Sequence, residues 1–190
     1  MSDAPISRYP IADVDDLPGD LRDTIRAIEE KTGFIPNVFL AMAHRPDELR
    51  AFMAYHDALM ERDSGLTKAE REMIVVATSG ANNCLYCVVA HGAIVRIRAK
   101  DSRLSAQLAT NHRKADITDR QKAMLDFALK VSLDSAAITD EDFVPLRDHG
   151  FSDEDIWDIA GVSAFFAMSN RMANFLSMRP NDEFYSMARA

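Results

Sequence analysis

The 190-residue chain has few cysteines, few glycines and prolines, and little positive charge. Two cysteines, Cys84 and Cys87, are too few and too close together for the disulfide framework of a small secreted protein. Seven glycines and seven prolines leave long stretches without a residue that breaks helices. A net charge of −8 argues against a nucleic-acid-binding protein, which needs basic residues to neutralise phosphates. These absences favour a helix-rich globular protein. Its two cysteines either form a reactive site or lie close together by chance.

Long hydrophobic runs and targeting segments are also missing from the sequence. The most apolar stretches, 73–78 and 159–168, are shorter than the roughly 18 residues of a membrane-spanning helix and are flanked by charges. The first residues lack the cationic and apolar parts of a signal peptide. We therefore expect a single cytoplasmic domain, residues 1–190, that contacts neither membrane nor nucleic acid.

Hydrophobic periodicity and capping residues predict an all-α fold. Thr67 with Glu70, and Thr118 with Gln121, form capping boxes ahead of apolar positions at spacings of three and four. Strand-like alternation of apolar and polar residues is not found. We expect helices over residues 18–32, 37–44, 47–62, 67–81, 83–99, 102–111, 119–132, 140–149, 153–178 and 181–189.

Two of the expected helices start in a similar way, which raises the question of an internal duplication. Residues 66–75 and 151–160 each contain a cap, an acidic first turn and an apolar continuation. A duplicated helical unit would explain this similarity. Chance would explain it as well, because capped amphipathic helices resemble one another.

The cysteines lie where one expected helix ends and another begins. Asn82 and Asn83 follow the first helix, so we expect an asparagine to cap the second and Cys84 to lie in its first turn. Free backbone N–H groups at that position favour a thiolate. Cys87 follows three residues later and His91 four residues after that, so the three side chains share a face. The thiols can then close a disulfide while His91 moves a proton.

Glu72 is an unusual residue in the preceding helix. It stands beside Met73 and Ile74 in a run that otherwise looks buried. A carboxylate among apolar neighbours tends to have a raised pKa, which suits a general base near neutral pH. The alternative is a solvated glutamate that complements the dipole of the first helical turn.

Other interpretations of the cysteine pair remain open. Cys84 and Cys87 could be small buried hydrophobic residues whose spacing to His91 arises by chance. The same three side chains have the right chemistry for zinc, but a closed structural site needs a fourth ligand and the chain has no further cysteine. Haem attachment is excluded because Val88, not histidine, follows the second cysteine.

Glu72, Cys84, Cys87 and His91 resemble the Glu-x(11)-Cys-x-x-Cys-x-x-x-His motif of the alkylhydroperoxidase D-like (AhpD-like) proteins, within the carboxymuconolactone decarboxylase-like superfamily. The flanking sequences extend the resemblance to roughly residues 15–185. They are Gly33-Phe-Ile-Pro-Asn37, His44-Arg-Pro46 and Asn170-Arg-Met-Ala-Asn174, which are similar to the peroxidase-related branch of that superfamily.

The resemblance implies an all-α bundle that forms a homo-oligomer, often a trimer or hexamer, and reduces peroxides with a dithiol. It makes Cys87 the peroxidatic thiol, Cys84 the resolving thiol, and Glu72 with His91 the proton relay. It divides the chain into an N-terminal extension, 1–62, and a core, 63–190, that carries the cysteine helix. It implies no cofactor and no metal, and an external dithiol reductant of lipoyl or thioredoxin type.

One residue departs from the pattern of some members. Tyr86 stands where they have a second histidine, and a tyrosine near pKa 10 acts as a hydrogen-bond donor rather than a base. We therefore expect Tyr86 at most to support the relay. Decarboxylase members of the superfamily generally lack the cysteine pair, which disfavours that reaction here.

The remaining histidines and aromatic residues suggest packing roles. Trp157 is expected in the core. Four histidines lack partners at ligand spacing and are expected at the surface or at helix ends: His44, His56, His112 and His149. An apolar stripe at helical spacing is expected in the core or a subunit interface, or lining a pocket for an apolar hydroperoxide: Phe165, Phe166, Met168, Met172, Phe175 and Leu176.

The sequence thus predicts a thiol-dependent hydroperoxidase or dithiol–disulfide oxidoreductase. Two alternatives stay open. One is a non-catalytic or redox-sensing helical oligomer, and the other is an enzyme that acts on a small lactone or carbonyl compound with Glu72 or His91 as base.

Overall fold

A computed structural model describes residues 5–189. Residues 1–4, where the signal-peptide pattern is missing, and residue 190 lie outside this range. The regular structure of the described residues is helical, which confirms the all-α prediction. The α-helices are α1 (Gly19–Thr32), α2 (Asn37–Met42), α3 (Pro46–Met60), α4 (Lys68–Ala81), α5 (Leu85–Ala99), α6 (Leu104–Asn111), α7 (Asp119–Leu133), α8 (Val144–Asp148), α9 (Asp153–Leu176) and α10 (Asp182–Ser186). Short 3-10 helices connect them: η1 (Val14–Asp16), η2 (His112–Lys114), η3 (Ser135–Ala137) and η4 (Asp140–Phe143).

The helix ends follow the capping residues of the sequence. Thr67, Thr118 and Ser152 each accept a backbone N–H bond at the start of α4, α7 and α9, and each box is closed by the side chain three residues later. Gly33, with φ of 84°, ends α1 in the left-handed conformation that glycine adopts without strain.

The helix predicted over 140–149 is wrong as a single element. The chain there forms η4 and then α8. Pro145 explains the break, because proline has no N–H to donate to the preceding turn and is favoured at the start of a helix.

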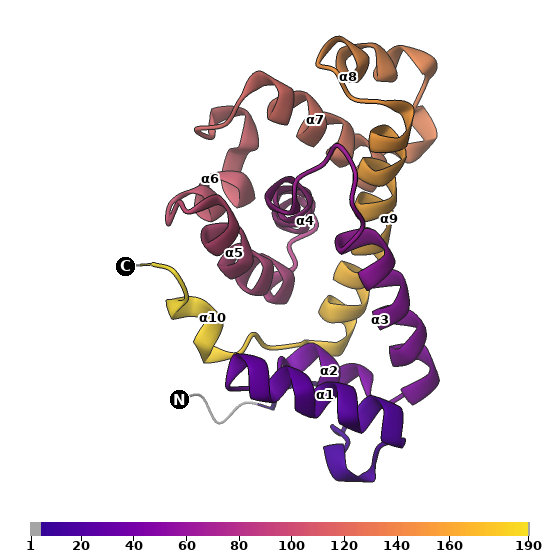
Figure 1. Cartoon of the computed structure of the whole chain (residues 1–190), viewed down its shortest axis with the longest axis vertical. Coiled ribbons are helices and arrows are strands. Elements are labelled where there is room, and N and C mark those ends of the chain that lie inside the picture. Colours follow the sequence, from indigo (N-terminus) through magenta and orange to yellow (C-terminus); the bar gives the residue numbers. More distant parts are fainter. Residues whose placement is uncertain (1–4, 190) are drawn as a thin grey trace.

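Helix α4 lies in the middle of the bundle, with α5, α6, α7 and α9 around it (Figure 1). Its residues 70–79 are buried on every side, which explains why the stretch is apolar all round rather than amphipathic. Near its end, Gly80 allows close contact with α6, because a Cβ there would lie 2.5 Å from the carbonyl oxygen of Ala109. The central position of α4 places Glu72 inside the protein.

Two hydrophobic clusters fill the interior. The larger one joins α4, α7 and α9 with parts of the neighbouring helices. The smaller one joins α1 and α2 to the first turns of α5, the end of α9 and α10, and it contains both cysteines. Figure 1 shows α1, α2 and α10 gathered at the end of the bundle where α5 begins. The division at residue 62 and the internal duplication stay predictions.

Helix α9 corrects the prediction for Trp157. This side chain is 73% exposed, because the neighbouring Ile156 and Ile159 occupy the inward face of α9. The apolar stripe of the same helix splits in a similar way. Phe165, Phe166 and Leu176 are buried, whereas Met168 and Phe175 are exposed.

None of the helices formed by residues 5–189 has the length and apolar character needed to cross a membrane.

Candidate active site

The turn between α4 and α5 places the dithiol. Asn82 ends α4, and Asn83 takes a left-handed conformation with φ of 54°. Cys84 itself is the N-cap of α5, and its Sγ accepts the backbone N–H of Cys87 at 3.3 Å. The expectation of an asparagine cap with Cys84 in the first turn is therefore wrong by one position. The reason is that Asn83 has a left-handed backbone, whereas an N-cap residue needs the extended backbone that Cys84 adopts, and the Asn82 amide bonds to Ser132 and Asn170 instead.

Both cysteines are free thiols and almost fully buried, with exposed fractions of 1% for Cys84 and 2% for Cys87. The hydrogen bond from the Cys87 side chain lowers the pKa of Cys84, and the backbone N–H of Cys87 adds to this effect against the cost of burial. The same hydrogen bond, together with burial and the Cys84 charge, raises the pKa of Cys87 well above its ordinary value. One negative charge is therefore favoured on Cys84 while Cys87 keeps its proton.

Glu72 and His91 form a hydrogen-bonded pair beside the thiols. The carboxylate Oε2 of Glu72, from α4, lies 2.8 Å from Nδ1 of His91, from α5. An ionised carboxylate only accepts, so Nδ1 carries the hydrogen and Nε2 keeps its lone pair. The edge of Phe166 packs against the imidazole at a centroid distance of 4.8 Å and holds the ring. Glu72 is buried, whereas 14% of the His91 side chain is exposed, so the pair connects the interior to solvent.

Tyr86 lies between the two cysteines in the sequence, but its side chain bonds to the start of α2. Its hydroxyl oxygen accepts the backbone N–H of Val38 at 3.1 Å, and the side chain is buried. Burial raises the pKa of Tyr86 above its ordinary value. Tyr86 therefore ties the first turn of α5 to the start of α2.

Sequence reasoning missed a polar network behind the thiols. Asn170 of α9 is fully buried, and its side chain hydrogen-bonds to Ser79 and Asn82. Against the larger effects of Cys84 and of burial, Asn170 and Ser169 act to lower the pKa of Cys87. A signal was present, because Asn170 falls at helical spacing from Phe166 on a buried face, and a buried amide needs partners.

The other histidines contribute packing and surface contacts. His112 is the C-cap of α6, which confirms its expected position at a helix end, and it is buried and pairs with Asp126 at 2.7 Å. His149 caps the end of α8, as expected. His56 packs against the rings of Phe165 and Phe166 from α3, on the same chain as the site.

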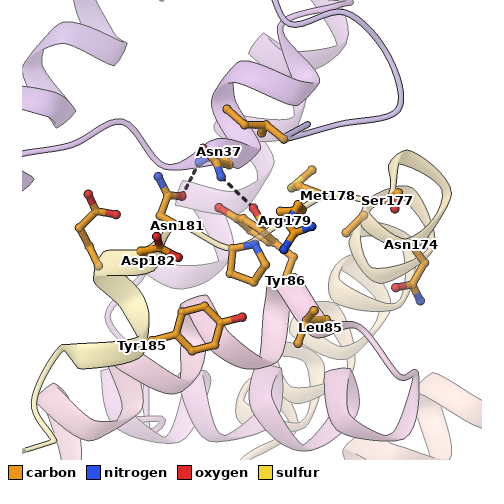
Figure 2. Close-up of a pocket in the computed structure, with 14 residues that line it drawn as sticks. Asn37, Leu85, Tyr86, Asn174, Ser177, Met178, Arg179, Asn181, Asp182 and Tyr185 are labelled. Atoms are coloured by element: carbon orange, nitrogen blue, oxygen red, sulfur yellow. Dashed lines mark hydrogen bonds between the residues drawn. The ribbon is translucent and has the colours of Figure 1, made fainter. Parts of the chain in front are cut away.

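A cavity of about 640 Å³ lies beside the start of α5 (Figure 2). Leu85 and Tyr86 form part of its wall, and the segment 177–183 forms another part. On its rim, Asn37 donates to the side chain of Asn181 and to the carbonyl of Arg179, each at 2.8 Å (Figure 2). The exposed side chain of Leu85 thus borders a hollow next to the dithiol.

Within residues 5–189, no group of three or more His, Cys, Asp and Glu side chains is arranged to hold a metal ion.

Known proteins resemble this chain over nearly its whole length. Residues 46–130 match the Carboxymuconolactone decarboxylase family. A peroxidase-related protein from Ralstonia eutropha JMP134, described as an alkylhydroperoxidase AhpD core, is 62% identical over 98% of each chain, with a TM-score of 0.97. A peroxidase-related protein from Silicibacter sp. TM1040 is 44% identical over 99% of this chain and 97% of that chain, with a TM-score of 0.91.

More distant comparisons add only the fold. The debrominase Bmp8 is 22% identical over 96% of this chain and 95% of its own, with a TM-score of 0.75. This level of identity establishes a shared fold and carries no reaction with it. No curated protein matches the chain.

Proposed function

Since the chain belongs to the AhpD-like proteins of the carboxymuconolactone decarboxylase superfamily, we propose that it is a thiol-dependent hydroperoxidase. Cys84 and Cys87 are its redox pair. The observation that carries the proposal is the buried dithiol at the start of α5, next to the Glu72–His91 hydrogen bond. The peroxidase-related description of two close relatives supports the same reaction class.

The relay has a definite task in this proposal. Cys87 is the thiol that keeps its proton, because Cys84 and burial raise its pKa. To attack, Cys87 needs a base, and His91 lies one helical turn further along the same face of α5. Glu72 holds the imidazole with Nε2 unprotonated and stabilises the imidazolium after it accepts the proton.

The redox steps follow from thiol chemistry. The Cys87 thiolate attacks the terminal oxygen of the hydroperoxide, the O–O bond breaks, and the alkoxide leaves with the proton from His91 as an alcohol. Cys87 is then a sulfenic acid. The Cys84 thiolate attacks its sulfur, a disulfide forms, and hydroxide leaves as water. An external dithiol restores both thiols and becomes a disulfide itself.

The order of the two thiols has a competing assignment. The favoured position of negative charge is Cys84, at the helix N-terminus, which supports Cys84 as the attacking sulfur. Trapping of the sulfenic acid with dimedone separates the two assignments. We expect the adduct on Cys87 in Cys84→Ser, whereas an adduct found only on Cys84 in Cys87→Ser reverses the roles.

The partners belong to the same proposal. We propose a lipoyl- or thioredoxin-like dithiol as reductant and a homo-oligomer, trimer or hexamer, as the working form. Trp157, Met168 and Phe175 support the oligomer, because these exposed apolar side chains lie on one face of α9. Sedimentation velocity tests it, and a monomer at micromolar concentration contradicts it.

Consumption of cumene hydroperoxide with dithiothreitol as reductant tests the activity. We expect turnover in the wild type and none above background in Cys87→Ser, because the sulfenic acid cannot form. His91→Asn removes the proposed base. His112→Asn is its matched control, since both histidines are largely buried and paired with a carboxylate. Equal rates in wild type and Cys87→Ser refute the peroxidase, and oxidation of the pair without turnover favours a redox-sensing protein instead.

A further inference from the structure

The turn between α4 and α5 is held from outside by side chains of two other helices. Asn82 donates one Nδ2 hydrogen to Oγ of Ser132 in α7 at 2.9 Å and the other to Oδ1 of Asn170 in α9 at 3.0 Å. Its backbone carbonyl accepts from Nδ2 of Asn174, also in α9, at 3.2 Å. Bonds from α7 and α9 therefore converge on one residue of the turn.

Asn170 extends this hold to the last turn of α4. Its own Nδ2 donates to Oγ of Ser79 at 2.9 Å, so one buried amide joins Ser79 to Asn82. The backbone carbonyl of Ser79 in turn accepts the N–H of Cys84 at 2.9 Å. Buried polar groups that satisfy one another make a segment rigid. The network therefore fixes the chain that leads into the first cysteine.

The position of Cys84 decides whether the two thiols can meet. Cys84 is the N-cap of α5 with an extended backbone, and Cys87 is the third residue of the helix. These are the two positions whose side chains approach each other in a capping box. The Sγ of Cys84 lies 3.3 Å from the backbone nitrogen of Cys87, which is the corresponding contact. A looser turn would let the start of α5 fray and the sulfurs separate.

We propose that Asn82 is a positioning residue of the dithiol. It holds the turn in the form that places the Cys84 sulfur at the start of α5, and it thereby raises the effective concentration of one thiol at the other. A disulfide between Cys84 and Cys87 then closes more readily than it would in a turn without these bonds. The inference rests on the proposed dithiol chemistry and assigns a role to a residue outside the Glu–Cys–Cys–His motif.

Equilibration with glutathione measures this effect. Oxidised glutathione takes two electrons and two protons from the protein thiols, which become a disulfide, and two molecules of reduced glutathione form. Acid quenching, alkylation and mass spectrometry give the oxidised fraction and hence the equilibrium constant. We expect Asn82→Ala to lower this constant by about tenfold, and Ser132→Ala, which removes one bond, by about two- to fivefold, since hydrogen bonds contribute on that scale.

Ser163→Ala is the matched control. Ser163 is a buried serine like Ser132, but its hydroxyl donates within α9 to the carbonyl of Ile159. We expect its equilibrium constant to equal that of the wild type. A purely structural role of Asn82 would lower the free energy of unfolding of the reduced and oxidised proteins alike and leave the equilibrium constant unchanged. Urea unfolding of both forms measures that quantity.

An unchanged or higher equilibrium constant in the folded variants, or an equal decrease in Ser163→Ala, overturns the proposal. If Asn82→Ala does not fold, Ser132→Ala decides alone, because it removes one hydroxyl and leaves the turn residues in place. The exchange with glutathione needs no peroxide. A protein without hydroperoxidase activity that still shows the decrease therefore loses the proposed function and keeps the positioning role of Asn82.

Discussion

Arg71 and Glu72 are neighbours on α4, and each pairs with a side chain of a different helix inside the protein. Arg71 pairs with Asp158 of α9 at 2.7 Å, and both side chains are almost completely enclosed. Its guanidinium also donates to the carbonyl of Leu59 and the hydroxyl of Ser64. Glu72 pairs with His91 of α5, whose side chain reaches solvent and follows Cys87 by one helical turn.

The difference shows that burial and pairing alone do not identify a catalytic group. Arg71 connects α4 to the end of α3, to the loop that follows it and to α9, and its Nη1 and Nη2 donate to acceptors of the protein itself. The Glu72–His91 pair contains an imidazole whose Nδ1 contacts the carboxylate and whose Nε2 is not part of that bond. The first pair therefore contributes to stability, whereas the second has the groups that the proposed relay needs.

The largest expected effect is on activity in Glu72→Gln. Without the carboxylate, His91 loses its fixed tautomer and the stabilisation of its charged form, so we expect hydroperoxide turnover to fall by about 10²–10⁴-fold. The free energy of unfolding should change by no more than about 1.5 kcal/mol, because one hydrogen bond is weakened. Initial rates and urea unfolding measure the two quantities.

Glu70→Gln is the control for this variant. Glu70 is also buried on α4, where it closes the capping box of Thr67 and pairs with Arg120. The Glu70→Gln substitution should lower the free energy of unfolding and leave the hydroperoxide turnover of the folded protein unchanged. If both variants lose activity equally, Glu72 has no special role.

The next effect is on stability in Arg71→Met. Removal of the guanidinium leaves Asp158 buried without its main partner, which costs about 3–5 kcal/mol. Chemical unfolding measures the loss. Arg62→Met is the comparison, because Arg62 is partly exposed and pairs with the exposed Glu154, and such pairs contribute about 1 kcal/mol or less, while its contact with the buried Asp158 is longer, at 3.6 Å. Similar losses in the two variants contradict the structural role of the Arg71 pair.

The pKa values of Cys84 and Cys87 are shifted in opposite directions. We therefore expect the two thiols of the wild type to be alkylated over different pH ranges. The lowered pKa of Cys84 keeps it a thiolate at pH values where an ordinary thiol is protonated, and its reactivity disappears only as the pH falls through that lowered value. The raised pKa of Cys87 delays its reaction to pH values above those of an ordinary thiol. Mass spectrometry of the modified peptide follows both sites, and a single midpoint at the ordinary value for both cysteines would contradict this prediction.

The smallest effect is expected in Tyr86→Phe. Its hydroxyl accepts the Val38 N–H, so the change removes one hydrogen bond between α5 and α2 at a cost of about 0.5–1.5 kcal/mol. Turnover should stay within twofold of the wild type if Tyr86 only anchors the N-terminal helices. A loss of turnover comparable to Glu72→Gln would place Tyr86 in the relay after all.

Local sequence patterns determined much of the fold. Thr67, Thr118 and Ser152 start helices through bonds to residues three positions away, so the information lies within one turn of chain. The same locality explains why spacing alone suffices to predict that Cys84, Cys87 and His91 meet at one helix. Two predictions from local patterns were wrong: the expected helix breaks at Pro145, and Trp157 is exposed. Helical spacing alone does not decide where a helix restarts or which of its faces turns inward.

The chain by itself determined the helices, the dithiol spacing and the presence of a carboxylate in an apolar run. Only the tertiary structure decided which helix faces meet. It placed Glu72 against His91 across two helices, and it brought Asn170, which lies far beyond the cysteines in the sequence, to Ser79 and Asn82 just before them. The physical reason is that capping and periodicity act within a few residues, whereas the environment of a buried charge is supplied by side chains that come together only when the core packs.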